Sequence, residues 1–200
     1  MIMMEGIFKE TTRFESDFYV GDYNEYAKSH KDCQCIGVTI SDVPLPDIQS
    51  LHFINKQHVS VLAINFEKNL GYFKDDKDKL VPNCECMLVS DKARRKGWLI
   101  LAELKYCGGN PRTVNDNFEN ALAQVNATFL YLRDEKHLFG AEKYKCVWVI
   151  SLPEHDNLIP FSQFYPSPER LLDYKEKLNV NLICSNEIEI LTHQHVRNAL

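Results

Sequence analysis

The chain has 200 residues, 44% of them hydrophobic and 26% charged, which excludes a disordered protein and supports one domain with its own core. The formal net charge of −5 excludes a protein that coats nucleic acid through bulk charge, although it allows a local basic face. There is no signal-peptide pattern at the N-terminus, and every apolar run is too short to span a bilayer. We therefore expect a cytoplasmic protein without a membrane partner.

In the N-terminal third the periodicity is weak. Residues 7–20 and 35–40 have strand-like composition, and residues 22–31 are compatible with a short helix. A second helix is expected to begin at Pro46, because the apolar residues that follow it partly keep a helical period. The apolar segment at residues 59–66 has no clear period.

From residue 84 onward the patterns are clearer. Segments with strand composition alternate with segments whose apolar residues lie three and four apart, as on one face of a helix. We predict strands over residues 84–90, 98–107, 144–151, 180–184 and 187–191, and helices over residues 117–134 and 167–178. This order predicts a single α/β domain over residues 1–200, with a central mixed β-sheet flanked by helices.

The seven cysteines are an odd set in a chain without an export signal, which favours reduced thiols over a disulfide framework. Cys33 and Cys35, like Cys84 and Cys86, lie in strand-like segments, where alternate residues share a face. A zinc site is the alternative interpretation, but the usual spacing of two residues between paired cysteines is missing.

The two strands of the segment 84–107 carry two carboxylates and a lysine. A symmetric hairpin places Glu85 directly opposite Glu103, and paired residues share a face. Lys105 projects from the same face as Glu103, with Leu104 on the other. Because two close carboxylates repel each other, a divalent cation between them relieves the repulsion. Oxygen ligands of this kind suit Mg²⁺, which polarises phosphate groups and lowers the pKa of bound water.

A carboxylate, a hairpin and then Glu103-Leu104-Lys105 within an apolar strand resembles the PD-(D/E)XK superfamily of restriction-endonuclease-like nucleases. The resemblance implies a restriction-endonuclease-like core that hydrolyses DNA. It also implies that Mg²⁺ or Mn²⁺ is held by Glu85, Glu103 and the backbone carbonyl of Leu104. Lys105 would then be a catalytic residue beside the attacking water. Gln124, on the helix that follows, would be a catalytic residue of secondary importance.

The match covers residues 82–151, and the rest of the chain carries none. The superfamily most often has an aspartate as its first carboxylate, so Glu85 departs from the pattern. Asp91 is the competing candidate, but symmetric pairing places it opposite Gly97, well away from Glu103. We therefore prefer Glu85.

Basic residues near these strands are candidates for contacts with a nucleic-acid backbone. They are Lys92, Arg94, Arg95 and Lys96 in the predicted turn, and Arg112 after the second strand. A solvated hairpin tip explains the turn equally well. DNA rather than RNA follows from the resemblance alone, and a homodimer stays open.

Two other interpretations compete with a nuclease. One is a non-catalytic binding or assembly module that keeps a nuclease-like scaffold. The other is an unrelated α/β enzyme in which the Glu103-Leu104-Lys105 triplet is structural, and Lys105 only forms an ion pair with Glu85 or Glu103 at a sheet edge, without a metal. Metal binding distinguishes the nuclease from both.

Overall fold

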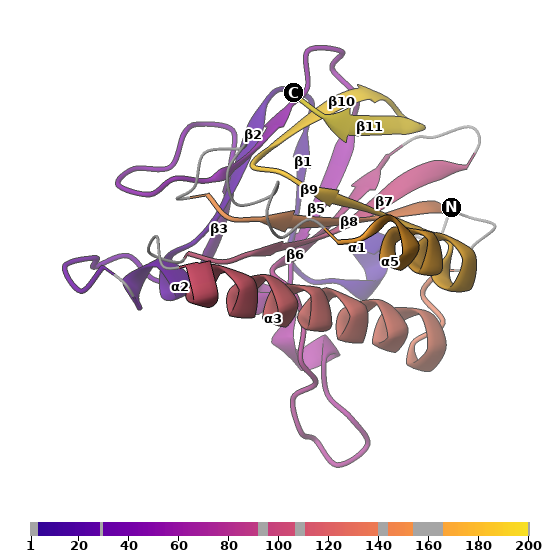
Figure 1. Cartoon of the computed structure of the whole chain (residues 1–200). Helices are drawn as coiled ribbons and strands as arrows, with labels where there is room; N and C mark the ends of the chain where they lie inside the picture. The colour runs from indigo at the N-terminus through magenta and orange to yellow at the C-terminus, as the bar shows by residue number, and fades with distance from the viewer. Residues whose placement is uncertain are drawn as a thin grey trace.

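The computed structural model describes residues 4–28, 30–91, 96–106, 111–139, 144–153 and 166–199, and its strands form two sheets that pack face to face (Figure 1). The larger sheet has the order β1 (Thr11–Phe14), β5 (Val61–Asn65), β6 (Cys86–Ser90), β7 (Gly97–Leu104), β8 (Tyr144–Ser151) and β9 (Val180–Cys184). The smaller sheet has the order β11 (His195–Asn198), β10 (Glu187–Thr192), β4 (Leu51–Ile54), β2 (Phe18–Asp22) and β3 (Val38–Ser41).

Both sheets are mixed. In the larger one, β5, β6 and β7 form an antiparallel meander, whereas β8 and β9 run parallel to β7. The crossover from β7 to β8 contains α3 (Pro111–Leu130), which continues into a π-helical turn at Tyr131–Glu135. In the smaller sheet, β10 and β4 are parallel and the other pairs are antiparallel.

Helices α3 and α5 (Pro168–Asp173) lie on one side of the larger sheet (Figure 1). Figure 1 shows α3 beside α5, which continues into a second π-helical turn at Tyr174–Leu178 before β9. The other helical segments are short: α1 (Met4–Ile7), α2 (Tyr23–Ala27) and a 3₁₀ helix at Glu67–Tyr72. No helix in the described part of the chain is both long enough and apolar enough to cross a membrane.

Side-chain alternation along β7 divides the core in two. Leu99 and Leu101 lie in the core that includes Phe118 of α3, whereas Ile100 and Leu104 lie in the core between the sheets. Each fully buried side chain of this size contributes roughly 1.5–3 kcal/mol of hydrophobic stabilisation. The same alternation assigns Glu103 to the face of the sheet that α3 covers.

Several sequence predictions are confirmed by these elements. β8 and β9 have the predicted bounds, and Ser167 caps α5 by accepting a hydrogen bond from the Arg170 N–H at 3.3 Å. The ladder between β6 and β7 has the symmetric register, with Cys86 opposite Ala102. The predicted central helix is present but begins earlier, at Pro111, because proline is tolerated in the first turn of a helix.

Other expectations need correction. In the described part of the chain, α3 and α5 cover one face of the larger sheet, and the smaller sheet covers the other. The helix expected from Pro46 is wrong, because residues 51–54 form strand β4 with buried Leu51 and Phe53 alternating with partly buried neighbours. Residues 7–20, which look strand-like throughout, are divided among α1, β1 and β2. The fold is therefore α/β with two mixed sheets.

Candidate functional site

The candidate site lies where β6 begins and β7 ends. The regular ladder stops at Cys86 and Ala102, and the Glu85 N–H donates to the Ala102 carbonyl at 3.1 Å. Glu85 is therefore displaced from the regular position opposite Glu103. It remains adjacent to the end of the ladder and is partly buried.

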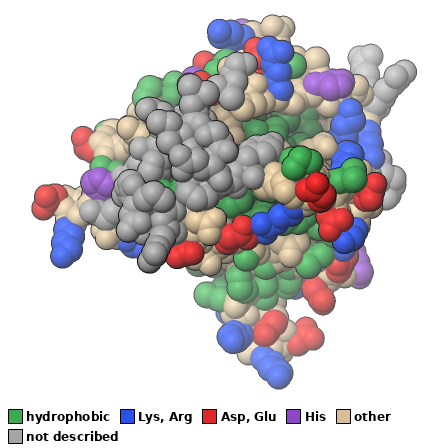
Figure 2. Space-filling model, viewed as in Figure 1, with side chains coloured by type: hydrophobic (Ala, Val, Ile, Leu, Met, Phe, Trp, Pro, Cys, Tyr) green, Lys and Arg blue, Asp and Glu red, His purple; other side chains and the backbone are tan. Residues whose placement is uncertain are grey.

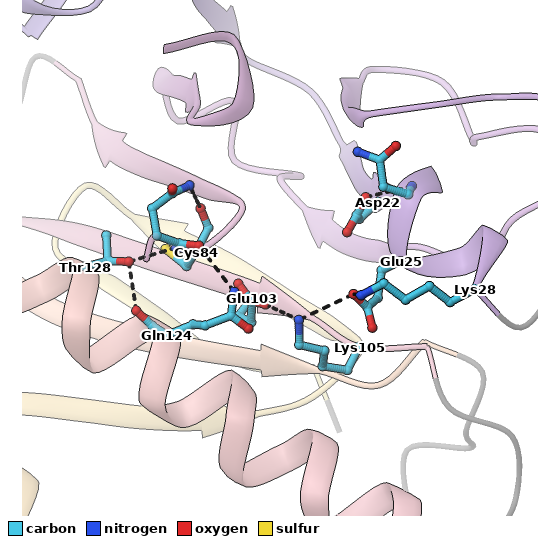
Figure 3. Close-up of polar contacts among 10 residues, drawn as sticks. Asp22, Glu25, Lys28, Cys84, Glu103, Lys105, Gln124 and Thr128 are labelled. Atoms are coloured by element: carbon cyan, nitrogen blue, oxygen red, sulfur yellow. Dashed lines mark hydrogen bonds and ion pairs between the residues drawn. The ribbon is translucent and has the colours of Figure 1, made fainter. Parts of the chain in front are cut away.

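Because of this irregularity, the side chains of Cys84 and Cys86 point to opposite faces of the sheet. Cys84 lies in the core beneath α3, whereas Cys86 lies in the core between the sheets. The expectation that these two cysteines share a face is wrong, because strand alternation is interrupted at Glu85. The Cys84 N–H donates to Thr128 Oγ1 of α3 at 2.7 Å, which holds this stretch against the helix (Figure 3).

Glu103 is fully buried, with 0% of its surface exposed. Its Oε1 lies 2.7 Å from Lys105 Nζ, and its Oε2 has no hydrogen-bond partner within the described part of the chain. Burial raises the pKa of Glu103 to about 7, although the neighbouring Lys105 acts in the opposite direction. A buried carboxylate oxygen without a partner is unfavourable unless a proton or a cation compensates it.

Lys105 lies between two carboxylates from distant parts of the chain. Its Nζ is 3.6 Å from Glu25 Oε2 on α2, in addition to the contact with Glu103 (Figure 3). Burial lowers the pKa of Lys105, but Glu103 and Glu25 outweigh this effect and raise it to about 12. Lys105 is therefore charged at neutral pH. Glu25 also accepts a hydrogen bond from Lys28 Nζ at 2.6 Å.

The region of α2 contributes two carboxylates that the sequence analysis did not find. Asp22 caps the helix by accepting the Asn24 N–H at 2.9 Å, and Glu25 follows in the first turn. Burial raises the pKa of Asp22, and the pKa of Glu85 is raised by burial and then by Glu103 and Asp22. The available signal was an aspartate followed three residues later by a glutamate, a helix-start pattern that carries no information about β7.

The direction of the Leu104 carbonyl follows from the strand geometry of β7, and its role as a metal ligand stays a prediction. The Leu104 side chain packs between the sheets. Carbonyls alternate in direction along a strand, so the Leu104 carbonyl points to the same side as that of Ala102, which accepts from Glu85. The carbonyl therefore points toward the strand that carries Glu85.

Gln124 lies on the face of α3 that is turned toward the site. The side chain is half-buried, donates to the Asn83 carbonyl at 3.4 Å and lines a pocket together with Lys105. The predicted packing of this helix over the sheet face that carries Glu103 and Lys105 is confirmed. A catalytic role for Gln124 stays a prediction.

Asp91 is not part of this site. It lies at the other end of β6, is buried and forms an ion pair with Arg13. Its burial is therefore explained by a structural contact, and Glu85 remains the candidate for the first carboxylate.

Most of the predicted nucleic-acid contacts fall where the structure gives no side chains. Lys92, Arg94 and Arg95 lie outside the described residues, as does the side chain of Arg112. Lys96 precedes β7, at the end opposite Glu103. At roughly 3.3 Å of rise per residue, the two are separated by about 23 Å along the strand. The structure therefore does not bring Lys96 to the carboxylates.

Within the described ranges, no three or more histidine, cysteine, aspartate and glutamate side chains are grouped closely enough to hold a metal ion. The six described cysteines, among them the two pairs considered for zinc, are free thiols. A Mg²⁺ ion makes a smaller demand, because it usually keeps several waters and takes only one or two protein carboxylates.

The comparisons with known proteins yield no relative: no family model, no curated protein and no solved structure matches the chain. The fold defines the class, an α/β protein with two mixed sheets and a buried charged cluster at the end of its central strands. Any function has to be argued from the chemistry of that cluster.

Proposed function

We propose that this chain is a metal-dependent nuclease of the PD-(D/E)XK type, which hydrolyses phosphodiester bonds in DNA. The observation that carries the proposal is the fully buried Glu103, with its unpartnered Oε2, next to Lys105 at the end of β7. Buried ionisable groups with perturbed pKa values are typical of functional sites. Residues 82–151, which carry the resemblance, contain β6, β7, α3 and β8, and this is the order of strand, strand, helix and strand that the sequence predicts for them.

The charge of the cluster favours the binding of a cation. Four carboxylates and two ammonium groups belong to it: Asp22, Glu25, Glu85, Glu103, Lys28 and Lys105. Fully ionised, these groups leave an excess of two negative charges. One divalent cation neutralises that excess, and it also offsets the repulsion from Glu103 and Asp22, which adds to the effect of burial in raising the pKa of Glu85.

Glu85, Glu103 and the Leu104 carbonyl would hold Mg²⁺ or Mn²⁺. The unpartnered Oε2 of Glu103 agrees with this assignment, because an orphaned carboxylate oxygen is an available ligand. When bound, the ion supplies Lewis-acid polarisation of the phosphate and lowers the pKa of a bound water.

Lys105 supplies positive charge at the reacting phosphate. Its side chain is 9% exposed and lines the pocket beside α3, so its ammonium group lies at the boundary between the buried carboxylates and the solvent. From there it donates to a phosphate oxygen or to the attacking water. In a site from which bulk water is largely excluded, such a contact is stronger than in solution. Gln124, on the pocket wall, orients the water.

A second candidate is a non-catalytic module with the same scaffold. It is favoured by the contact of 2.7 Å between Lys105 and Glu103, because an ammonium group can compensate the buried carboxylate without a metal. This candidate predicts loss of stability, but no loss of metal affinity, when either residue is replaced.

The test is cleavage of a panel of labelled DNA and RNA molecules with and without Mg²⁺. We expect Mg²⁺-dependent cleavage of DNA by the wild-type protein and none by Glu103→Gln. Glu119→Gln is the matched control, because it makes the same chemical change at a residue of α3 that pairs with Arg170. A wild-type protein that neither cleaves any substrate nor binds Mg²⁺ in calorimetry would refute the proposal.

A further inference from the structure

A pocket opens between α2 and α3, beside the candidate site. Its volume is about 520 Å³, within the range of roughly 300–1,000 Å³ that is usual for pockets that bind small ligands. Lys105 and Glu25 line it on one side and Lys28 stands at its rim, while α3 provides the wall with Asn117, Asn120 and Gln124.

Charges of alternating sign lead from the buried carboxylate to this rim, as Figure 3 shows. Lys105 Nζ is 2.7 Å from Glu103 and 3.6 Å from Glu25, and Lys28 Nζ is 2.6 Å from Glu25. Side-chain exposure rises along the same path, from 0% at Glu103 through 9% and 11% to 70% at Lys28. The most deeply buried group of this series is therefore negative, and the most exposed one is positive.

The wall provided by α3 is neutral and rich in hydrogen-bonding groups. Asn117, Asn120 and Gln124 are spaced three and four residues apart, so they lie on one helix face, where their amides both donate and accept. The short side chain of Ala123 on the same face leaves room beside them. Glu119 of this helix is turned to Arg170, which it contacts at 2.6 Å.

The balance of charge in the pocket is unlike that of the whole chain. Two ammonium groups and one carboxylate line it among the described residues, whereas the chain has a formal net charge of −5. On the face drawn in Figure 2, acidic and basic side chains are interspersed, and the basic ones form no continuous patch. An anion is therefore attracted to the pocket by local groups and not by the charge of the surface as a whole.

We propose that this pocket binds a phosphate group of a nucleic-acid strand, next to the phosphate that is hydrolysed, with Lys28 as its main cationic contact. The pocket provides an ammonium group for the phosphate and amides for the adjoining sugar or base. Among the described residues Lys28 pairs with Glu25, and its side chain is 70% exposed, so its ammonium group can contact a phosphate at the mouth of the pocket while it stays beside Glu25. That the strand is a nuclease substrate rests on the proposed function.

Binding of a fluorescently labelled single-stranded DNA oligonucleotide to the full chain tests this, measured by anisotropy in EDTA so that cleavage plays no part. Lys28→Gln is compared with Lys177→Gln, which removes the same charge from a lysine that is also 70% exposed and also paired with a carboxylate. We expect about tenfold weaker binding for Lys28→Gln, since a charged hydrogen bond is lost, and wild-type binding for Lys177→Gln. The slope of log K against log salt should decrease by about 0.7 for Lys28→Gln alone.

A second variant, Ala123→Glu, adds a carboxylate to the wall of the pocket at an exposed helix position and should abolish binding without unfolding the chain. Equal affinities for Lys28→Gln and Lys177→Gln, wild-type affinity for Ala123→Glu, or no binding by the wild-type protein would each overturn the inference. Cleavage is measured separately with Mg²⁺. If oligonucleotide binding depends on Lys28 but the protein never cleaves, the proposed nuclease activity is refuted, while the inference that the pocket binds a phosphate group stands.

Discussion

The variant Glu103→Gln distinguishes most sharply between two interpretations of Glu103, as a metal ligand or as a member of a structural ion pair with Lys105. Burial raises the pKa of this carboxyl from its ordinary value of 4.5 to about 7 in the folded protein. The folded protein therefore holds the proton more tightly than the unfolded chain does. The stability that follows from this is fully present below pH about 4.5 and is lost as the pH rises through about 7.

The size of this loss of stability follows from the shift in the pKa of Glu103. At about 1.4 kcal/mol per pKa unit, the loss is on the order of 3 kcal/mol, or roughly 6–12 °C of melting temperature in a chain of this length. Glu103→Gln has no proton to lose at this position, so its melting temperature should lack this part of the pH dependence. Metal-free Glu103→Gln should be at least as stable as the wild-type protein near pH 8.

The assay is a thermal melt at several pH values between 4.5 and 8.5, with and without Mg²⁺. Mg²⁺ at about one hundred times its dissociation constant should stabilise the wild-type protein by roughly 2.7 kcal/mol at pH 8. The gain should shrink below pH 7, where protons compete for Glu103, and it should be nearly absent in Glu103→Gln. Glu119→Gln should behave like the wild type, because its carboxylate pairs with Arg170 outside the cluster.

A different pattern would refute the reasoning. If Glu103 and Lys105 only pair with each other, removing either leaves a partly or fully buried charge unpaired, and stability falls by about 3–5 kcal/mol. A large loss of melting temperature in both Glu103→Gln and Lys105→Ala, together with unchanged Mg²⁺ affinity in Glu103→Gln, would exclude the metal site.

Lys105→Ala should still bind Mg²⁺ but should cleave about 10²- to 10³-fold more slowly in single-turnover experiments, because an electrostatic stabiliser is lost; a loss below tenfold would remove this residue from the mechanism. Glu85→Gln should weaken Mg²⁺ binding in calorimetry, whereas Asp91→Asn should cost only about 1 kcal/mol of stability, since its partner Arg13 is 41% exposed. The reverse pattern would assign the metal to Asp91. Ser167→Ala should lower the stability by about 1 kcal/mol in thermal melts, because its hydroxyl caps α5 through a hydrogen bond of 3.3 Å; an unchanged melting temperature would show that this cap contributes nothing.

Elements with a strong local pattern could be predicted from the sequence. β8 is a continuous apolar segment, and its bounds at Tyr144–Ser151 agree with the prediction. The register between β6 and β7 also agrees, because the two strands follow one another in the sequence with few residues between them, which limits their alignment. The candidate triplet at Glu103 could be found for the same reason, since a charged pair inside an apolar strand is visible in a few consecutive residues.

Where local patterns are ambiguous, the secondary structure predicted from the sequence was wrong. Residues 48–59 keep a partly helical period, yet β4 forms there because β2 and β10 pair with it on both sides. The helix start at Asp22 was visible as a pattern, but its position beside Lys105 was not. That contact joins segments far apart in the chain, and the pairing of β2 with β3 and β4 holds α2 in place.

The sequence by itself determined the central strands, the helix that covers them and the charged pair Glu103 and Lys105 at the end of β7, because these depend on the period of neighbouring side chains. Only the tertiary structure decided that a second sheet covers the other face, that Glu85 leaves the regular ladder, and that Glu25 contacts Lys105. The physical reason is that burial and charge pairing depend on which distant segments meet. That choice is made by the packing of the whole chain and not by any one stretch of it.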